Sequence, residues 1–72
     1  MHMMSQIDVS RAQSIASKAG LKPARVKGTD VLQFTRRGGT NFEVIDWSTF
    51  TSTLEERGLH VYESSGWLKI MK

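Results

Sequence analysis

The chain has 72 residues and a mass of 8.1 kDa, and ten lysine and arginine residues against seven acidic residues give it a formal net charge of +3. So small a chain predicts one domain that buries few apolar side chains, which argues against a large, deep substrate cavity and leaves dimerisation open. The lack of cysteine excludes disulfides, thiolate metal sites and cysteine nucleophiles, and no apolar run approaches the ~20 residues of a membrane span. We therefore expect a cytoplasmic protein without a cofactor, a bound metal, a membrane partner or a small-molecule substrate.

The opening residues Met1-His2-Met3-Met4 are typical of a cloning scar or a disordered start. The predicted domain therefore covers residues 5–72, and His2 takes no part in any predicted site.

A helix is predicted from about Asp8 to Ala19. Its apolar side chains recur at the spacing of one helix face, namely Val9, Ala12, Ile15, Ala16 and Ala19. Ser5 and Asp8 have the spacing of a capping box, in which the Ser5 hydroxyl would cap the helix. Gly20 followed by Leu21 predicts a left-handed end to this helix.

Two strands are predicted next, because Pro23 cannot continue a helix. Val31–Thr35 and Phe42–Asp46 are β-branched and aromatic runs, and the glycine-rich segment Arg36–Asn41 between them predicts the turn of a hairpin. Lys27–Asp30 predicts a second turn, or a bulge, at the start of this hairpin.

A second helix and a second hairpin complete the chain. The helix has one apolar face and ends near Arg57, and its start has three candidate caps, Asp46, Ser48 and Ser52. Gly58-Leu59 closes it as Gly20-Leu21 closes the first helix. The final hairpin runs from His60–Glu63 through a Ser64-Ser65-Gly66 turn to Trp67–Met71.

The predicted order is α-β-β-α-β-β, a single α+β domain with both helices packed on one face of an antiparallel sheet. Each helix ends in Gly-Leu and is followed by a strand, a turn and a strand, as if the second half repeated the first. Any helix that ends in glycine before a hairpin would give the same pattern, so duplication and coincidence are both open.

Charge is distributed unevenly along the chain. The segment from Arg11 to Thr40 contains seven basic residues and one acidic residue, Asp30. The segment from Asn41 to Glu63 contains five acidic residues and one basic residue, Arg57. The chain is thus an electric dipole in sequence. A basic, glycine-rich hairpin can follow a phosphate backbone, because glycine lets the main chain approach and arginine matches phosphate oxygens.

The leading hypothesis is a small, non-enzymatic module that binds DNA or RNA through this hairpin. The predicted phosphate contacts are Arg25, Lys27, Arg36 and Arg37, with Lys69 as a secondary contact. The alternative at the same residues is solvated charge that keeps the strand edges from associating.

The aromatic residues suggest a second surface. Phe34, Phe42, Trp47 and Phe50 have core spacing, whereas alternation puts Trp67, Lys69 and Met71 on one sheet face and Leu68 and Ile70 on the other. Tyr62 and Trp67 are expected to pair across the final turn, and a base-stacking platform of Trp67 beside Lys69 is the alternative. Tyr62, Trp67 and Met71 are therefore the predicted interaction surface, and homodimerisation or binding of a protein partner through Trp67–Met71 is the alternative function.

Catalytic residues are scarce. His60 is the one imidazole left for acid-base chemistry, and its position at a strand start favours a structural role; ribonuclease-like activity that depends on His60 is a third alternative. Glu55 and Glu56 are adjacent on a helix and point apart. We therefore predict that the protein is not an enzyme.

From the first predicted helix through the second, the order of helix, Gly20-Leu21, basic strand, Lys27-Gly28-Thr29, strand and helix resembles that of HicA-type toxins, small mRNA-cleaving proteins. The resemblance implies a double-stranded-RNA-binding-like fold for this part of the chain. In that family a histidine follows the Lys-Gly-Ser/Thr step, whereas here Asp30 and Val31 follow it. The resemblance therefore does not carry the catalytic residue over.

Overall fold

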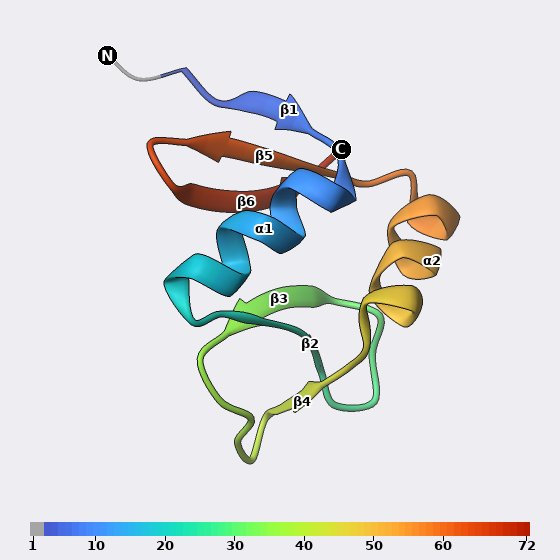
Figure 1. Ribbon diagram of the computed structural model, residues 1–72. Helices are drawn as coiled ribbons and strands as arrows, with labels where there is room; N and C mark the ends of the chain where they lie inside the picture. Colours follow the sequence, from blue (N-terminus) through green and yellow to red (C-terminus); the bar gives the residue numbers. More distant parts are fainter. Residues whose placement is uncertain (1–2) are drawn as a thin grey trace.

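The computed structural model describes residues 3–72 and contains two helices and six strands, which confirms the predicted α+β class. The expectation for Met1 and His2 lies outside the described residues. The elements in chain order are β1 (Ser5–Ile7), α1 (Val9–Ala19), β2 (Lys22–Val26), β3 (Leu32–Thr35), β4 (Phe42–Val44), α2 (Trp47–Arg57), β5 (His60–Ser64) and β6 (Trp67–Met71) (Figure 1).

The first helix begins one residue after its cap. The Asp8 carboxylate accepts a hydrogen bond from the Arg11 amide at 2.8 Å, so Asp8 itself is the N-cap. The prediction that Ser5 caps this helix is wrong, because Ser5 lies in β1 and pairs with Glu63. At the other end Gly20 has φ 72°, and the Leu21 amide donates to the Ala16 carbonyl at 2.7 Å, which confirms the predicted left-handed end.

The second helix is closed at both ends in the same way. Asp46, one of its three candidate caps, accepts from the Thr49 amide at 2.7 Å. Gly58 has φ 64°, and the Leu59 amide donates to the Leu54 carbonyl at 2.9 Å.

The prediction of the final hairpin is confirmed, but the prediction of the first hairpin is wrong. β5 and β6 pair across a tight Ser65-Gly66 turn in which both residues have positive φ. β3 and β4, by contrast, do not pair with each other, because each pairs with one edge of β2. The hairpin is formed by β2 and β3 instead, and Lys27–Asp30 is its turn, closed by a bond from the Val26 amide to the Val31 carbonyl at 2.9 Å.

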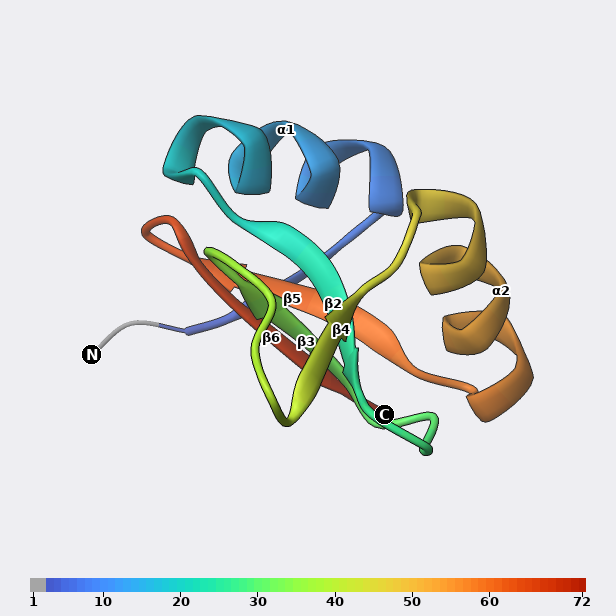
Figure 2. The ribbon, with the colours of Figure 1, turned by 90° about the horizontal axis from the view of Figure 1, so that it is seen from below.

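The six strands form two antiparallel sheets rather than the single sheet expected from the sequence. Their strand orders are β1-β5-β6 and β3-β2-β4. The edge strands β6 and β3 lie side by side (Figure 2). Helix α1 lies against β5 of the first sheet, and α2 lies against β2 of the second.

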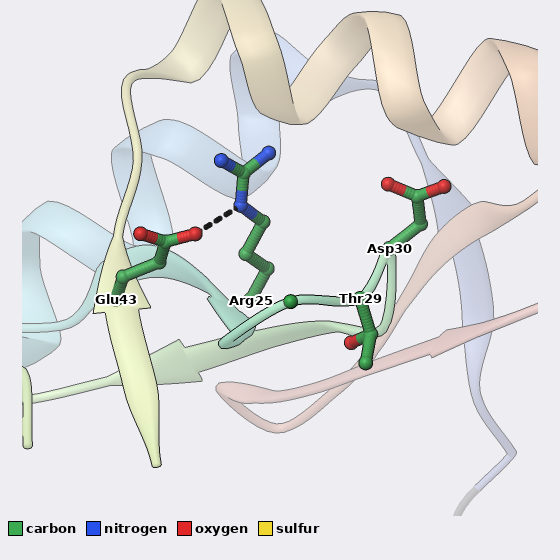
Figure 3. Close-up of a pocket in the computed structure, with 5 residues that line it drawn as sticks. Arg25, Thr29, Asp30 and Glu43 are labelled. Atoms are coloured by element: carbon green, nitrogen blue, oxygen red, sulfur yellow. Dashed lines mark hydrogen bonds and ion pairs between the residues drawn. The ribbon is translucent and has the colours of Figure 1, made fainter. Parts of the chain in front are cut away.

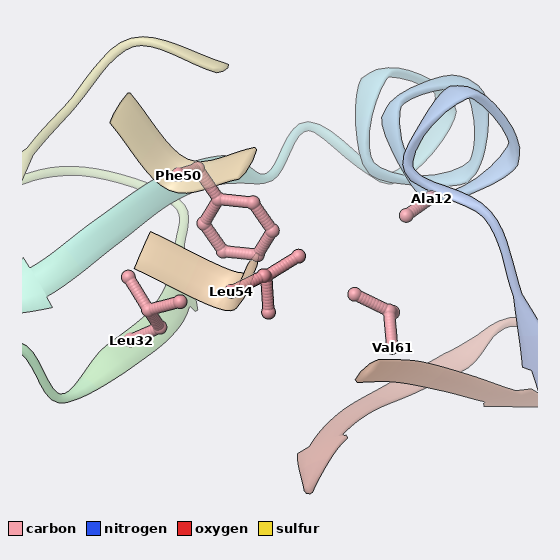
Figure 4. Packing of buried hydrophobic residues seen from close by; sticks show 5 residues of the cluster. All are labelled: Ala12, Leu32, Phe50, Leu54 and Val61. Carbon is pink, nitrogen blue, oxygen red and sulfur yellow. The ribbon is translucent and has the colours of Figure 1, made fainter. Parts of the chain in front are cut away.

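The core lies between the helices and the sheets. Its buried cluster consists of Ala12, Leu32, Phe50, Leu54 and Val61 (Figure 4). The Phe50 ring has no exposed surface and packs against the rings of Phe34 and Trp47, with centroids 5.3 Å away in both cases. The predicted core spacing of Phe34, Trp47 and Phe50 is therefore confirmed, while Phe42 lies half-buried outside this cluster.

The chain is an internal repeat in which the two halves exchange strands. β1-α1-β2-β3 matches β4-α2-β5-β6, with Asp8 and Asp46 as equivalent caps and Gly20 and Gly58 as equivalent helix ends, 38 positions apart in both cases. β1 pairs with β5 of the other half, and β4 pairs with β2 in the equivalent register. This correspondence of caps, helix lengths and strand registers favours the interpretation of a repeat over coincidence.

Strand exchange mixes the two charged halves of the sequence. One lobe is the continuous segment 22–57, which holds β2, β3, β4 and α2, and the other contains β1, α1, β5 and β6 from the two ends of the chain. The first lobe carries six basic and five acidic side chains, and the second carries four and two. The strong dipole of the sequence is therefore largely cancelled in space.

Candidate nucleic-acid interface

Arg25 is neutralised by an acid of the second half of the chain. It lies opposite Glu43, and its Nε donates to Glu43 Oε1 at 2.5 Å. Figure 3 shows both side chains on the side of β2 that faces α2, with the Asp30 carboxylate beyond the guanidinium. The three side chains line a shallow pocket of about 250 Å³. Because two carboxylates flank one guanidinium, this pocket does not attract a phosphate.

Lys27 lies far from the two predicted arginines. Lys22, at the start of β2, pairs with Thr35, so Arg36 and Arg37 leave the sheet at that end. Lys27 follows the opposite end of β2, where its amide donates to the Asn41 carbonyl at 2.9 Å. Five residue steps of extended chain separate Lys22 from Lys27, which is about 17 Å. The four predicted contacts of the first hairpin therefore do not form one surface.

A different group of cations does come together, at the C-terminal end of α1. We call Lys18, Lys22, Arg36 and Arg37 the basic end of the molecule. Arg36 Nη1 donates to the Ala19 carbonyl at 2.9 Å, which brings the connection after β3 onto the last turn of α1. Lys18 lies in that same turn, and Lys22 follows the helix cap Gly20 and Leu21. Cations are favoured at this end of a helix, because the unpaired carbonyls there carry partial negative charge.

None of the four cations of the basic end forms an ion pair within residues 3–72, where the Arg25–Glu43 pair is the single salt bridge. All four are therefore available to an external anion, although Arg36 also holds the Ala19 carbonyl.

The turn between β5 and β6 lies at the same end of the molecule. Gly66 in this turn and Lys18 on α1 both line a groove of about 320 Å³ along the helix. Figure 1 shows the turn beside the C-terminal end of α1. The basic end therefore continues onto the β1-β5-β6 sheet at Trp67, the residue after Gly66.

The side of the β1-β5-β6 sheet that points away from the core is called the open face. Along each strand, every second side chain lies on it. Leu68 and Ile70 pack against the core, and Trp67, Lys69 and Met71 lie on the opposite side, as predicted. By the strand register, the members of the open face are Met4, Gln6, His60, Tyr62, Ser64, Trp67, Lys69 and Met71.

The predicted pairing of Tyr62 with Trp67 is wrong. Trp67 lies opposite Ser64 and is 76% exposed, whereas Tyr62 lies opposite Lys69 and donates its hydroxyl to the Lys72 carbonyl at 3.4 Å. The aromatic ring pairs of residues 3–72 are confined to the three core rings Phe34, Trp47 and Phe50. Trp67 therefore presents its indole to solvent.

His60 lies on the open face, and its Nδ1 accepts from the Gln6 side-chain amide at 3.3 Å. Asp30 follows Thr29 in the turn between β2 and β3, and its carbonyl accepts a hydrogen bond from Arg57. Within the described part of the chain, no three His, Cys, Asp or Glu side chains lie close enough to hold a metal ion. In the same residues, no helix is long and apolar enough to cross a membrane.

The sequence interpretation missed Lys18 and Lys22 as members of a site. Both flank Gly20, so their closeness to each other was a readable signal. Their closeness to Arg36 depends on β2 pairing with β3, which the predicted hairpin of β3 and β4 did not include. Comparison with known proteins adds no candidate, because no family model, curated protein or solved structure matches the chain.

Proposed function

We propose that this protein binds nucleic acid through the basic end. The observation that carries the proposal is the gathering of Lys18, Lys22, Arg36 and Arg37 around one helix end without a carboxylate partner. Most nucleic-acid affinity comes from cations that neutralise backbone phosphates, and arginine guanidinium groups suit phosphate oxygens. The formal charge of +3 adds a weak attraction toward polyanions.

Three or four phosphate contacts set the expected salt dependence. Each contact contributes about −0.7 to the log–log slope of affinity against salt on single strands and about −0.9 on duplex DNA. The expected slope is therefore about −2 to −3.5. If these cations serve only to keep the surface solvated, no nucleic-acid binding is measured, and therefore no dependence of affinity on salt concentration.

The test measures binding of labelled DNA and RNA oligonucleotides by fluorescence anisotropy at about 50 and 200 mM salt. Replacing Lys18, Lys22 or Arg37 singly with Gln lowers the affinity at low salt and makes the slope shallower by about 0.7–0.9 per cation. Arg36 is left unchanged in this series, because it also bonds to the Ala19 carbonyl and its loss would disturb α1.

Arg25→Gln and Lys27→Gln are the matched controls, since each removes one positive charge outside the basic end. Both leave the salt slope unchanged. The proposal is contradicted if neither DNA nor RNA binds at low salt, or if the controls weaken binding as much as the variants of the basic end.

A second candidate is self-association, or binding of a protein partner, through the Trp67–Met71 strand. The exposed indole of Trp67 supports it, because large aromatic side chains are enriched at interface centres. Sedimentation of the wild type and of Trp67→Ala over a concentration series tests self-association directly. We also propose a cytoplasmic location, because the sequence has no cysteine that would point to an oxidising compartment.

A further inference from the structure

The internal repeat provides a comparison for the open face within the same molecule. Tyr62 on the open face corresponds to Ala24 in the first half, because the two residues are 38 positions apart, the offset of the repeat. Ala24 therefore marks the equivalent side of the β3-β2-β4 sheet. Ala24 has no exposed surface. Ala24 pairs with Val44 in β4. Val44 lies close to Gly38, in the segment that connects β3 with β4, because a Cβ placed on Gly38 would be 3.7 Å from Val44 Cγ2. Val44 is itself 45% exposed, so the chain covers that side of the second sheet at Ala24 but only in part at Val44.

The open face has no such cover within residues 3–72. Trp67 at its corner is 76% exposed, and Met4, Ser64, Trp67 and Lys69 border a hollow of about 510 Å³. The equivalent of Trp67 in the first half is the smaller Val31, at the matching position of the β2–β3 hairpin. The second half thus carries larger aromatic side chains on the side that its fold leaves uncovered.

The chemistry of the open face suits unpaired bases. It has an exposed indole, a half-buried tyrosine ring and one lysine, and among residues 3–72 it carries no acidic side chain, because Glu63 alternates onto the opposite side of β5. An aromatic ring on a sheet can stack on a base, and a neighbouring cation can contact the backbone that links one base to the next. Lys69 lies opposite Tyr62 and two residues from Trp67, so it is placed between the two rings.

We infer that the open face binds single-stranded nucleic acid, with Trp67 and Tyr62 stacking on unpaired bases and Lys69 contacting phosphate. This inference rests on the proposed function, since the strand reaches the open face from the basic end past Gly66. A duplex does not fit this role, because its bases are already stacked on one another and their ring faces are covered.

The test uses the full chain and a single-stranded oligonucleotide of about 12 nucleotides, with a duplex of equal length as the comparison. Tryptophan fluorescence reports stacking directly. The chain has two tryptophans, and the half-buried Trp47 lines a pocket beside Lys22 of the basic end. Quenching is therefore assigned to Trp67 by the difference between the wild type and Trp67→Ala. We expect quenching by the single strand and tighter binding of the single strand than of the duplex.

Trp67→Ala is expected to weaken single-strand binding about fivefold to 150-fold, the effect of losing one stacked base, and to abolish quenching. Trp67→Phe keeps a ring and recovers part of the affinity. Lys69→Gln makes the salt slope shallower by about 0.7. Because Trp67 is exposed, these variants keep the fold, which circular dichroism and thermal unfolding verify.

Three results separate the two proposals. Binding that depends on the basic end but is unchanged in Trp67→Ala overturns the open-face inference and leaves the proposed function standing. Self-association of the wild type that is lost in Trp67→Ala, without any effect on the affinity of the monomer for the oligonucleotide, also overturns it and assigns the face to a second copy of the chain. No binding of any oligonucleotide at low salt overturns both.

Discussion

Arg25 was predicted to contact phosphate, but in the folded protein it forms an ion pair with Glu43. It stands in the most basic part of the chain, yet strand pairing sets it against Glu43, 18 positions later. Both side chains are more than a third exposed, so the ion pair contributes at most about 1 kcal/mol to stability. Its larger consequence is to remove one cation from the set that can reach a phosphate.

Asp46 is the residue whose titration links pH to stability. The Thr49 amide, and then the Thr49 side chain, donate to its carboxylate and hold its pKa below the ordinary value of 3.8, while burial opposes this shift. A carboxyl group whose pKa is lower in the folded state favours folding above its unfolded pKa and loses that effect as the pH falls through its folded pKa. The stabilisation from Asp46 is therefore complete at neutral pH and is lost progressively as the pH falls below about 4 and through the folded-state pKa.

We predict that Asp46→Asn, which keeps a capping side chain that does not titrate, reduces the acid sensitivity of the fold. Near neutral pH the wild type has the higher thermal midpoint. The difference in thermal midpoint between the wild type and Asp46→Asn narrows or reverses between about pH 4 and pH 2. Thermal unfolding followed by circular dichroism measures the gap. Glu56→Gln is the control, because the exposed Glu56 carboxylate accepts no hydrogen bond and forms no ion pair within residues 3–72. A gap that is constant over this pH range would contradict the assignment.

At the scale of elements, local signals predicted the helices well and the strand pairing poorly. Caps and left-handed glycines fix helix ends within a few residues of chain, which is why Gly20 and Gly58 were predicted correctly. The pairing of β2 with both β3 and β4 depends on contacts between distant segments. β1 has three residues and no distinctive periodicity, so nothing in the sequence indicated it.

β1 nevertheless protects an edge of the molecule. It covers β5, and its Ile7 packs against the core. We predict that a chain beginning with an initiator methionine before Asp8 loses about 1–3 kcal/mol of stability, because it loses the burial of Ile7 and leaves the outer edge of β5 unpaired. At the urea dependence of about 1 kcal/mol/M that is typical of a small domain, this lowers the midpoint of unfolding by about 1–3 M.

The matched control for this truncation is a chain that begins at Ser5, which keeps β1 whole and is expected to unfold at the wild-type midpoint. Equal midpoints for both truncated chains would show that β1 contributes nothing to the stability of the sheet.

At the scale of the whole molecule, the exchange of strands between the halves decides where charge lies. A sequence dipole would become a dipole in space if each half folded as its own lobe. Here β1 and α1 join β5 and β6, while β2 and β3 join β4 and α2, so basic and acidic segments are interleaved. What survives is a local cluster at the end of α1, and its members come from three segments that only the tertiary fold brings together.

The candidate site was therefore predictable in part. Arg36, Arg37 and Lys69 were named from the sequence and lie on the basic end or the open face. The exposed side of β6 was also predicted, because alternation along one strand is a local property. Arg25 and Lys27 were assigned to the site because the sequence does not reveal which strand lies between β3 and β4.

The most direct measurement is amide chemical-shift mapping during titration with a single-stranded oligonucleotide at low salt. We predict that the shifts change most at Lys18–Lys22, at Arg36 and Arg37, and along Gly66–Lys69, and that they change little in the Lys27–Asp30 turn and in α2. Changes centred on Arg25, on the pocket that Arg25 borders and on Lys27, or no changes at all, would contradict this prediction.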